Sequence, residues 1–378
     1  MKSPMRKQFV MLFKVETIMP RVYNTRISEY HKINNNNDDI INPEYPLKGL
    51  HIELSNVCNH QCLFCPNRKI TRKKGFINEN FLKRILKEFY QLGFHEVGLY
   101  ANGEPFLSPN LPQYIRWAKD IGYSYVYIDT NGAAVEFDKI KDAINAGLDS
   151  IKFSINGTNE LNYQLIHGTN DFHKVIDNLK KTYEYKNQIN RPLNVFTSIA
   201  VTRYTEQDVD KFAEFLKQYC DDCVKNSVID MGGYIRDELK YLSVSKTNND
   251  FTQSMTIPCY LIFNSVFVSY EGYLQACCSD FQNYLVYADL NKTSFEEAWN
   301  NEIITDFRRR HLNNDVDGTP CMTCAYGKVG EWKPLISEYA TICNKNELDG
   351  YDIEDRIKKY NIGREKNDFG ADSSQGRK

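Results

Sequence analysis

The sequence predicts an α/β protein whose larger part is an incomplete barrel of about six β/α units, followed by a small domain of a β-hairpin and a helix. Short apolar runs alternate with longer amphipathic segments from Leu50 to Met231, which is typical of β/α units around a parallel sheet. The alternation stops after Met231, where hairpin and helix signals follow. A chain of 378 residues, 42% of them hydrophobic, can bury one large core and a smaller one.

Six short apolar strands are expected in the larger part: Leu50–Ser55, Glu96–Tyr100, Ser124–Asp129, Ser150–Ile155, Asn194–Val201 and Ser227–Met231. The helices expected between them are Asn78–Leu92, Leu111–Ile121, Glu136–Ala146, Phe172–Tyr185 and Glu206–Tyr219. Capping residues such as Asn78, Asp171 and Thr205 precede several of these helices. Because β/α crossovers are right-handed, the series implies a partial (β/α)6 barrel of the TIM type.

The later part of the chain begins after a polar stretch that we interpret as a linker. The segment SVFVSYEGYLQACC contains two β-type runs joined at Glu271-Gly272, which predicts a hairpin. Ser294 and Glu297 form a capping box for a helix that runs towards Arg310. The expected division is an N-terminal extension (1–47), a core (48–231), a linker (232–257), a second domain (258–330) and a C-terminal extension with a disordered tail (331–378).

Charge and hydropathy limit the classes of partner. Forty-seven basic residues against 49 acidic ones give a net charge of −2, so neither nucleic acid nor an anionic membrane is expected as a partner. No apolar run approaches the roughly 20 residues of a membrane span. The apolar run from Phe9 to Phe13 is too short for the core of a signal peptide. We therefore expect a cytoplasmic protein.

Three cysteines, Cys58, Cys62 and Cys65, directly follow the first expected strand, at the end of the barrel where active sites lie. Three thiolates this close together can wrap a cubane iron–sulfur cluster and leave one iron without a protein ligand. An open coordination position is what a catalytic metal centre needs. The alternatives are a zinc site with His60 as a further ligand, or unrelated buried thiols.

With this spacing, and with the aromatic Phe64 just before the third cysteine, the sequence resembles the radical S-adenosylmethionine (SAM) superfamily. The resemblance implies a [4Fe–4S] cluster held by Cys58, Cys62 and Cys65, whose open iron chelates SAM. It also implies reductive cleavage of SAM to a 5′-deoxyadenosyl radical that abstracts hydrogen from a substrate. A low-potential electron donor such as flavodoxin or ferredoxin would then be a partner.

Further segments resemble the family's SAM contacts, and their residues are Gly103, Glu104, Pro105, Asn131 and Ser154. The GEP segment resembles the motif for the SAM amino group, since a glycine admits close backbone approach and a carboxylate accepts a charge-assisted hydrogen bond. Ordinary turns are the alternative for the GEP and TNG segments. Relatives commonly have an arginine before a glycine where this chain has His167 before Gly168. We interpret His167 as an ordinary surface histidine.

Four later cysteines, Cys259, Cys277, Cys321 and Cys324, predict a second metal centre. Four thiolates complete the coordination of a cluster, so this centre would be structural or electron-carrying. The spacing, with SFEEAWN and PCMTC, resembles the SPASM/twitch domains of radical SAM enzymes, and the one-cluster twitch form fits best. Tetrathiolate zinc is the alternative. The neighbouring Cys278 is either an inert thiol or a hydrogen donor to a substrate radical.

An auxiliary [4Fe–4S] cluster near the substrate would accept an electron after hydrogen abstraction. The sequence therefore favours an oxidoreductase that dehydrogenates an alcohol-bearing small molecule such as a sugar or cyclitol, since the cysteine spacing is most similar to that of aminocyclitol dehydrogenases. The alternatives are a peptide-modifying SPASM maturase, a radical epimerase with a donor thiol, and a non-catalytic metal-binding protein. The substrate is thus expected to be a small molecule or a peptide, and no catalytic base is assigned.

Overall fold

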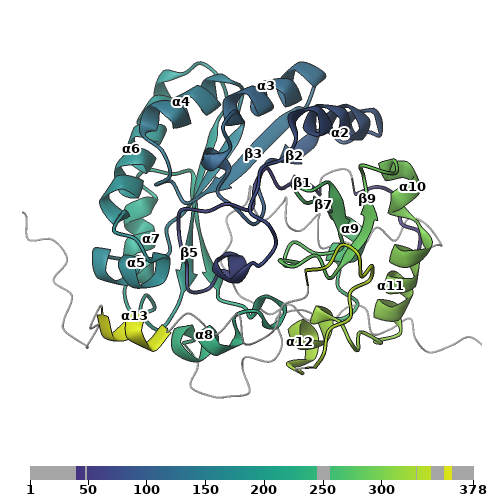
Figure 1. Cartoon of the computed structure of the whole chain (residues 1–378). Helices are drawn as coiled ribbons and strands as arrows, with labels where there is room; N and C mark the ends of the chain where they lie inside the picture. The colour runs from purple at the N-terminus through teal and green to yellow at the C-terminus, as the bar shows by residue number, and fades with distance from the viewer. Residues whose placement is uncertain (1–39, 47–48, 245–255, 329, 342–352, 360–378) are drawn as a thin grey trace, which may run out of the picture.

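The computed structural model describes residues 40–46, 49–244, 256–328, 330–341 and 353–359 (Figure 1). In this part of the chain nine strands form one sheet in the order β6-β5-β4-β3-β2-β1-β7-β8-β9. The strands are β1 (Leu50–Ile52), β2 (Glu96–Gly98), β3 (Tyr125–Thr130), β4 (Ser150–Ser154), β5 (Asn194–Val201), β6 (Asp222–Ser227), β7 (Val266–Val268), β8 (Tyr273–Gln275) and β9 (Val286–Asp289). Strands β1 to β6 are parallel, as the alternating pattern predicts.

The connections between the parallel strands are helical. In the first half of the chain they are η2 (Pro66–Lys69), α2 (Glu79–Gln91), η3 (Pro105–Leu107), α3 (Leu111–Ile121), α4 (Phe137–Asn145), α5 (Glu160–His167), α6 (Phe172–Gln188) and α7 (Val209–Leu216). The later helices are η4 (Met231–Gly233), α8 (Arg236–Leu242), α9 (Leu261–Asn264), α10 (Phe295–Trp299), α11 (Glu302–Leu312), α12 (Pro320–Tyr326) and α13 (Ile353–Lys359). Figure 1 shows α2, α3, α4 and α6 along the outside of the sheet.

Side-chain alternation decides which face of the sheet is covered. Leu50 and Ile52 of β1 are fully buried in the helix-covered core, whereas His51 between them points to the other face. Helix α2 covers its part of the core with the buried side of its amphipathic pattern, and the side chain of Asn78 caps it by accepting from the Phe81 N–H. The face away from the helices therefore carries polar and aromatic side chains, some of them half-buried, such as His51, and others buried, such as Tyr127.

The α/β fold class is confirmed, and the sheet remains open. Strands β6 and β9 are its edges, and no pairing in the described residues closes it into a barrel. The expected hairpin is confirmed as β7 and β8, which are antiparallel, with Gly272 at a φ of 95° in the turn. Strand β7 pairs in parallel with β1, so the C-terminal part continues the sheet of the first part.

Two expected elements coincide with the structure, and one was misplaced. Helix α3 and strand β5 have the expected bounds. The strand expected at Ser227–Met231 is wrong, because β6 spans Asp222–Ser227 and a 3-10 helix begins at Met231. Strand β6 is an edge strand with the polar sequence DCVKNS, which lacks the apolar run used to recognise the other strands.

Among the described residues, five α-helices were not expected from the sequence: α5, α8, α9, α12 and α13. Helix α5 begins with a capping box made by two asparagines, Asn159 and Asn162, in place of the usual Ser/Thr and Glu pair. Helix α8 lies inside the segment that we interpreted as a linker, and α13 lies in the C-terminal extension. The expected N-terminal extension up to residue 39 and the tail from residue 360 lie outside the described residues.

A buried arginine joins the first and last parts of the sheet. Arg72 donates to both carboxylate oxygens of Glu53, at 3.1 and 3.3 Å, and to Glu271 at 2.8 Å. Its Nε donates to the Phe281 carbonyl at 2.9 Å. The positive charge is therefore fully paired, as a buried guanidinium requires.

No helix in the described ranges is long and apolar enough to cross a bilayer.

Candidate functional site

The loop that carries Cys58, Cys62 and Cys65 leaves the carboxyl end of β1 and is fastened on two sides. The Gln61 N–H donates to the His167 carbonyl at 3.0 Å, and the Leu63 N–H donates to the Ile166 carbonyl at 2.9 Å. From α13, Arg356 donates to the Gln61 carbonyl at 2.7 Å. The loop thus has a defined conformation that the end of α5 and a C-terminal helix both support.

The three thiols of this loop are free and lie close enough for the charge of one to shift the pKa of another. Burial raises the pKa of the Cys58 thiol to about 12, and negative charge on Glu104 and Cys65 contributes. Burial and the charges of Cys65 and Cys58 raise the pKa of Cys62 well above its usual value. Thiols in such a group ionise at neutral pH only when a cation binds them. The donor set therefore fits a metal cluster.

Cationic groups and backbone N–H groups surround the same thiols. Burial raises the pKa of Cys65 as well, but the charge of Lys74 opposes the rise at Cys58 and Cys65. The charge of Arg356 opposes the rise in pKa at Cys62. The backbone N–H groups of His60 and Asn67 also favour the thiolate forms of Cys58 and Cys65. These N–H groups and positive charges suit an anionic iron–sulfur cluster.

Glu104 links the GEP segment to the end of β3. Its carboxylate accepts hydrogen bonds from the Phe106 N–H (3.1 Å), the Thr130 hydroxyl (2.7 Å) and the Asn131 N–H (2.8 Å). Burial nevertheless raises the pKa of Glu104 to about 7. Three of its roughly four acceptor positions are occupied, which leaves one for a further donor. Asn131 in turn donates to Asn59 Oδ1 at 2.8 Å, beside Cys58.

Gly103 is needed where it stands because of the backbone beside it. A Cβ atom on Gly103 would lie 2.2 Å from the Ser55 carbonyl oxygen and 2.7 Å from that of Val57. The GEP segment therefore lies directly against the start of the cysteine loop, and the Glu104 N–H donates to the Val57 carbonyl at 2.9 Å. Of the residues singled out in the sequence, Gly103, Glu104 and Asn131 are brought to the cysteine loop.

Phe64 lies within the cysteine loop, whereas Pro105 and Ser154 lie on neighbouring elements. Phe64 is half-buried and meets His167 edge-on at 6.3 Å between ring centroids. Pro105 is buried and begins η3. Ser154 ends β4, where it pairs with Ser198 of β5. A SAM contact for any of these residues stays a prediction.

The later cysteines also come together, although they lie on separate segments. Burial and the charges of Cys321 and Cys278 raise the pKa of Cys259 to about 12. Burial and the charges of Asp230 and Cys259 raise the pKa of Cys324 to about 12. Cys321 and Cys324 are three residues apart on α12 and so share one side of it. The four expected thiols therefore form a second group.

Cys278 belongs to this second group as a fifth thiol. A hydrogen bond shared between the two neighbours lowers the pKa of Cys278 and raises that of Cys277. Cys277 Sγ also accepts from the Ser279 N–H at 3.3 Å. The sequence analysis assigned Cys277 and not Cys278 as a ligand. Two adjacent cysteines do not reveal from sequence alone which side chain points towards the metal centre.

Comparison with known families agrees with both cysteine groups. Residues 52–216 match the radical SAM superfamily, and residues 259–325 match the SPASM iron–sulfur cluster-binding domain. The chain thus contains a radical SAM domain and a C-terminal SPASM domain. The first domain implies a [4Fe–4S] cluster and SAM, and the second implies auxiliary iron–sulfur clusters.

Curated relatives share part of this radical SAM chain. A protein named "Probable GTP 3',8-cyclase" from Saccharolobus islandicus is 28% identical over 169 residues, which are 45% of this chain and 53% of that protein. An uncharacterised protein of Methanocaldococcus jannaschii is 28% identical over 187 residues, 49% of this chain and 59% of the relative. The chain thus spans little more than half the length of these relatives.

Solved structures of other proteins share the fold. SuiB from Streptococcus suis, bound to its precursor peptide SuiA, has a TM-score of 0.55 at 13% identity and covers 75% of this chain and 69% of its own. The enzyme anSMEcpe with bound AdoMet has a TM-score of 0.52 at 13% identity, over 83% of this chain and 99% of its own. Both likenesses extend over the core and beyond it.

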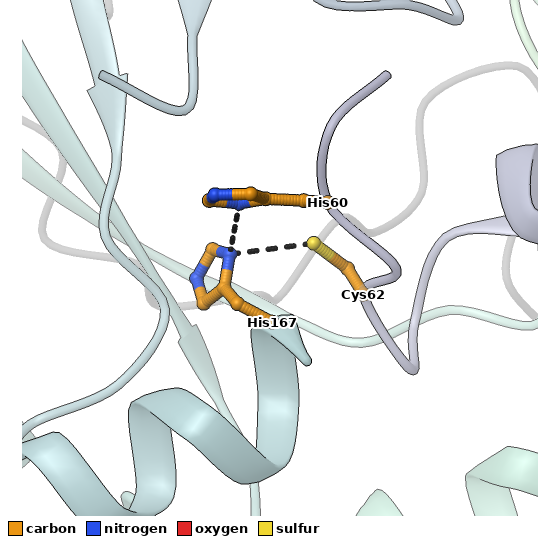
Figure 2. A group of neighbouring side chains, drawn as sticks. All are labelled: His60, Cys62 and His167. Atoms are coloured by element: carbon orange, nitrogen blue, oxygen red, sulfur yellow. Dashed lines mark hydrogen bonds between the residues drawn. The ribbon is translucent and has the colours of Figure 1, made fainter. Parts of the chain in front are cut away.

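The interpretation of His167 in this radical SAM domain as a surface histidine is wrong. Its side chain is 1% exposed, because it ends α5 directly under the cysteine loop. Figure 2 shows its Nδ1 facing both Cys62 Sγ, at 3.3 Å, and His60 Nδ1, at 3.1 Å. Burial lowers its pKa well below the usual value. The sequence signal was the pair His167-Gly168, where the resemblance leads one to expect an arginine before the glycine, but this signal gave no direction for the side chain.

The open face of the sheet carries residues that sequence reasoning missed. Lys152 of β4 lies opposite Asp129 of β3 in register, and their side chains form an ion pair of 2.6 Å. Tyr127, two residues before Asp129, meets Tyr100 at 5.9 Å and His51 at 5.9 Å between ring centroids. These side chains come together through the register of neighbouring strands, so no local sequence motif predicts them.

Proposed function

We propose that this chain is a radical SAM oxidoreductase in which Cys58, Cys62 and Cys65 hold a [4Fe–4S] cluster with one iron open for SAM. The observation that carries the proposal is the group of three free, electrostatically coupled thiols in one loop, at the carboxyl end of β1. The proposed SAM contacts are Phe64, Gly103, Glu104, Pro105, Asn131 and Ser154. The remaining acceptor position on Glu104 suits the ammonium group of SAM.

We assign Cys259, Cys277, Cys321 and Cys324 to one auxiliary [4Fe–4S] cluster of the twitch type. When bound, the two clusters and SAM would supply a 5′-deoxyadenosyl radical that removes a hydrogen atom from the substrate, and an acceptor for one electron. The protein must then hold the substrate near the cysteine loop and exclude water. The electron donor would be a low-potential protein such as flavodoxin or ferredoxin.

The open face of the sheet supports an alcohol-bearing substrate such as a sugar or cyclitol. Asp129 and Lys152 offer an acceptor and a donor to hydroxyl groups. The rings of His51, Tyr100 and Tyr127 offer apolar surface to the C–H faces of the same molecule. All five residues project from the sheet face away from the helices, next to the strand ends that carry the GEP and TNG segments.

Asp129 is our candidate for the general base. Oxidation of an alcohol to a carbonyl removes one hydrogen atom from carbon, one proton from oxygen and one electron. Asp129 can accept the proton, because a carboxylate oxygen is a suitable proton acceptor and the Lys152 ammonium lies 2.6 Å from it. Asp129 also lies close enough to Glu104 for its charge to raise the pKa of Glu104, so it lies beside the proposed SAM site.

The proposal is tested with anaerobically reconstituted protein, dithionite and SAM, and with cyclitols, sugars, GTP and peptides as substrates. Wild type should form 5′-deoxyadenosine and a carbonyl product from a polyhydroxylated substrate. Asp129→Asn should lower carbonyl formation about 100-fold, while it still forms 5′-deoxyadenosine, because only proton removal is lost.

Cys58→Ala is the control that should abolish both products. Products from peptides alone would replace the alcohol proposal with peptide modification, and a cyclised nucleotide would indicate the reaction named for the Saccharolobus relative. Cluster-loaded wild type that does not cleave SAM would refute the radical function.

A further inference from the structure

The hydrogen bonds around His167 determine where its proton lies. The backbone N–H of Asn156 points at His167 Nε2 at 3.1 Å. A backbone N–H can only donate, so Nε2 must be an acceptor and carries no proton. A doubly protonated ring would place two donors against each other there, so the ring is neutral. Its one proton is therefore on Nδ1, the atom that faces Cys62 Sγ at 3.3 Å (Figure 2).

His60 accepts a hydrogen bond from the Nδ1–H of His167. His60 Nε2 lies 3.2 Å from Asp171 Oδ2. A carboxylate oxygen can only accept a hydrogen bond, so His60 Nε2 is the donor and carries the ring proton. His60 Nδ1 is then an unprotonated acceptor 3.1 Å from His167 Nδ1. The His167 N–H is consequently shared between His60 Nδ1 and Cys62 Sγ. Asp171 accepts at one end of this chain of hydrogen bonds and the Asn156 N–H donates at the other. With both rings neutral, the proton of each ring can therefore be on one nitrogen only.

This assignment argues against a separate metal site at the same residues. The ligand atoms of His60, Cys62 and His167 all lie within 4.8 Å of one another, which is close enough to hold an ion. A histidine nitrogen ligates a metal through its lone pair, and the other nitrogen then carries the proton. His167 has the opposite arrangement, because its Nε2 is the acceptor. The arrangement of the trio His60, Cys62 and His167 therefore favours a hydrogen bond to sulfur over a bound metal ion.

We infer that His167 donates a hydrogen bond to the Cys62 thiolate and thereby raises the reduction potential of the cluster at Cys58, Cys62 and Cys65. This inference rests on the proposed function. Reduction adds negative charge to the cluster sulfurs, so a donor to one of them stabilises the reduced state more than the oxidised state. His167 acts through Cys62 and is therefore a positioning residue.

The ring of His167 is held in place on several sides. Tyr163 stacks on it at 4.1 Å between centroids, with 17° between the ring planes. The backbone of His167 is fixed by the Gln61 N–H, and Gly168 follows at a φ of 78° to end α5. Arg356 lies against Gly168, where a Cβ atom would meet its Nη2 at 1.6 Å. The donor therefore needs no reorganisation when the cluster accepts an electron.

Two substitutions separate the hydrogen bond to sulfur from the rest of the ring. In His167→Gln, the amide reaches the position of Nε2 and can still accept from the Asn156 N–H, but it has no donor at the position of Nδ1. In His167→Asn, the amide nitrogen takes the position of Nδ1 and can still donate to Cys62. A merely structural role would affect both variants, whereas the inferred role affects chiefly the first.

The measurement is a redox titration of each reconstituted variant, followed by the electron paramagnetic resonance signal of the reduced cluster. His167→Gln should lower the equilibrium constant for one-electron reduction about tenfold, a shift of about 59 mV to lower potential. His167→Asn should stay close to wild type. Equal potentials in all three proteins, with equal iron content, would overturn the inference.

Wild type labelled with ¹⁵N-histidine gives a second measurement that needs no variant. Pulsed electron paramagnetic resonance of its reduced cluster should detect a coupled histidine nitrogen, and absence of that coupling would overturn the inference even if His167→Gln loses its cluster. Stoichiometric zinc bound by the apoprotein and lost in His167→Gln would assign the trio to a metal instead. A wild type that binds no cluster would refute the proposed function itself, which the other outcomes leave intact.

Discussion

The two cysteine groups of this chain differ in how they are assembled and in the charges around them. Cys58, Cys62 and Cys65 come from one loop. The positive charges of Arg68, Lys74 and Arg356 act on them, against the negative charge of Glu104 on Cys58. The second group is collected from the segments of Cys259, Cys277 and α12. Negative charge on Asp230 acts on Cys324, and Asp280 acts on Cys321, where Arg310 opposes it.

The first cysteine group is encoded by one short stretch of sequence, whereas the second exists only after distant segments have folded together. A loop that supplies three ligands can hold its cluster once β1 and α5 are in place. The second group forms only when the segment of Cys259, the loop after β8 and helix α12 come together. Charge adds a second distinction, because cations near a cluster favour its reduction and anions oppose it. We expect the C-terminal cluster to have the lower potential for this reason.

The largest expected effect comes from removing one ligand of each group. Cys324→Ala should lose the iron of the C-terminal group while the protein still cleaves SAM, because the loop cysteines are untouched. Cys58→Ala should lose SAM cleavage completely and keep the C-terminal iron. Iron analysis and 5′-deoxyadenosine formation measure both outcomes. Loss of all iron in Cys324→Ala would break the comparison, since it would make the first group depend on the second.

Gly103→Ala probes the packing around the first group. The new methyl would lie 2.2 Å from the Ser55 carbonyl oxygen, which is backbone and cannot turn away. We expect a loss of about 3 kcal/mol in the free energy of unfolding, and weaker SAM binding. Denaturant unfolding and equilibrium binding measure these changes.

Gly318→Ala is the matched control for that substitution. Gly318 has a φ of 72° and no atom within 4 Å of a new Cβ, so only the backbone strain of about 1 kcal/mol applies. Iron at the C-terminal group should persist in both variants. Equal stability losses in the two variants would show that contact with Ser55 is unimportant.

How much of this site the sequence predicts depends on whether a residue's role is local. The spacing of Cys58, Cys62 and Cys65 and the hairpin at Gly272 are local patterns, and both elements were predicted. His167 and Arg356 approach the cysteine loop from α5 and α13, so their contacts exist only in the folded chain. Asp129 and Lys152 meet through strand register, which periodicity leaves undetermined.

The same distinction explains the errors in the fold. Strands recognised from apolar runs are central ones, buried on at least one face. Strand β6 is an edge strand whose residues Asn226 and Ser227 are exposed, so composition placed the strand in the following segment. Helix α5 has a weak amphipathic pattern because five of its eight residues are buried, His167 among them. The site residue that was misread thus lies on the helix that was missed.

The smallest expected effect tests the charges around the second group. Asp230→Asn keeps the acceptor that caps η4, where Oδ1 accepts from the Gly232 N–H at 3.1 Å, and removes the negative charge that acts on Cys324. The potential of the C-terminal cluster should rise by about 30 mV, roughly a threefold change in the reduction equilibrium. Asp237→Asn, whose carboxylate is exposed and paired with Lys240, should leave the potential unchanged. An unchanged potential in Asp230→Asn would mean that burial and backbone donors, rather than nearby side-chain charge, distinguish the two cysteine groups, and the lower potential expected for the C-terminal cluster would lose its basis.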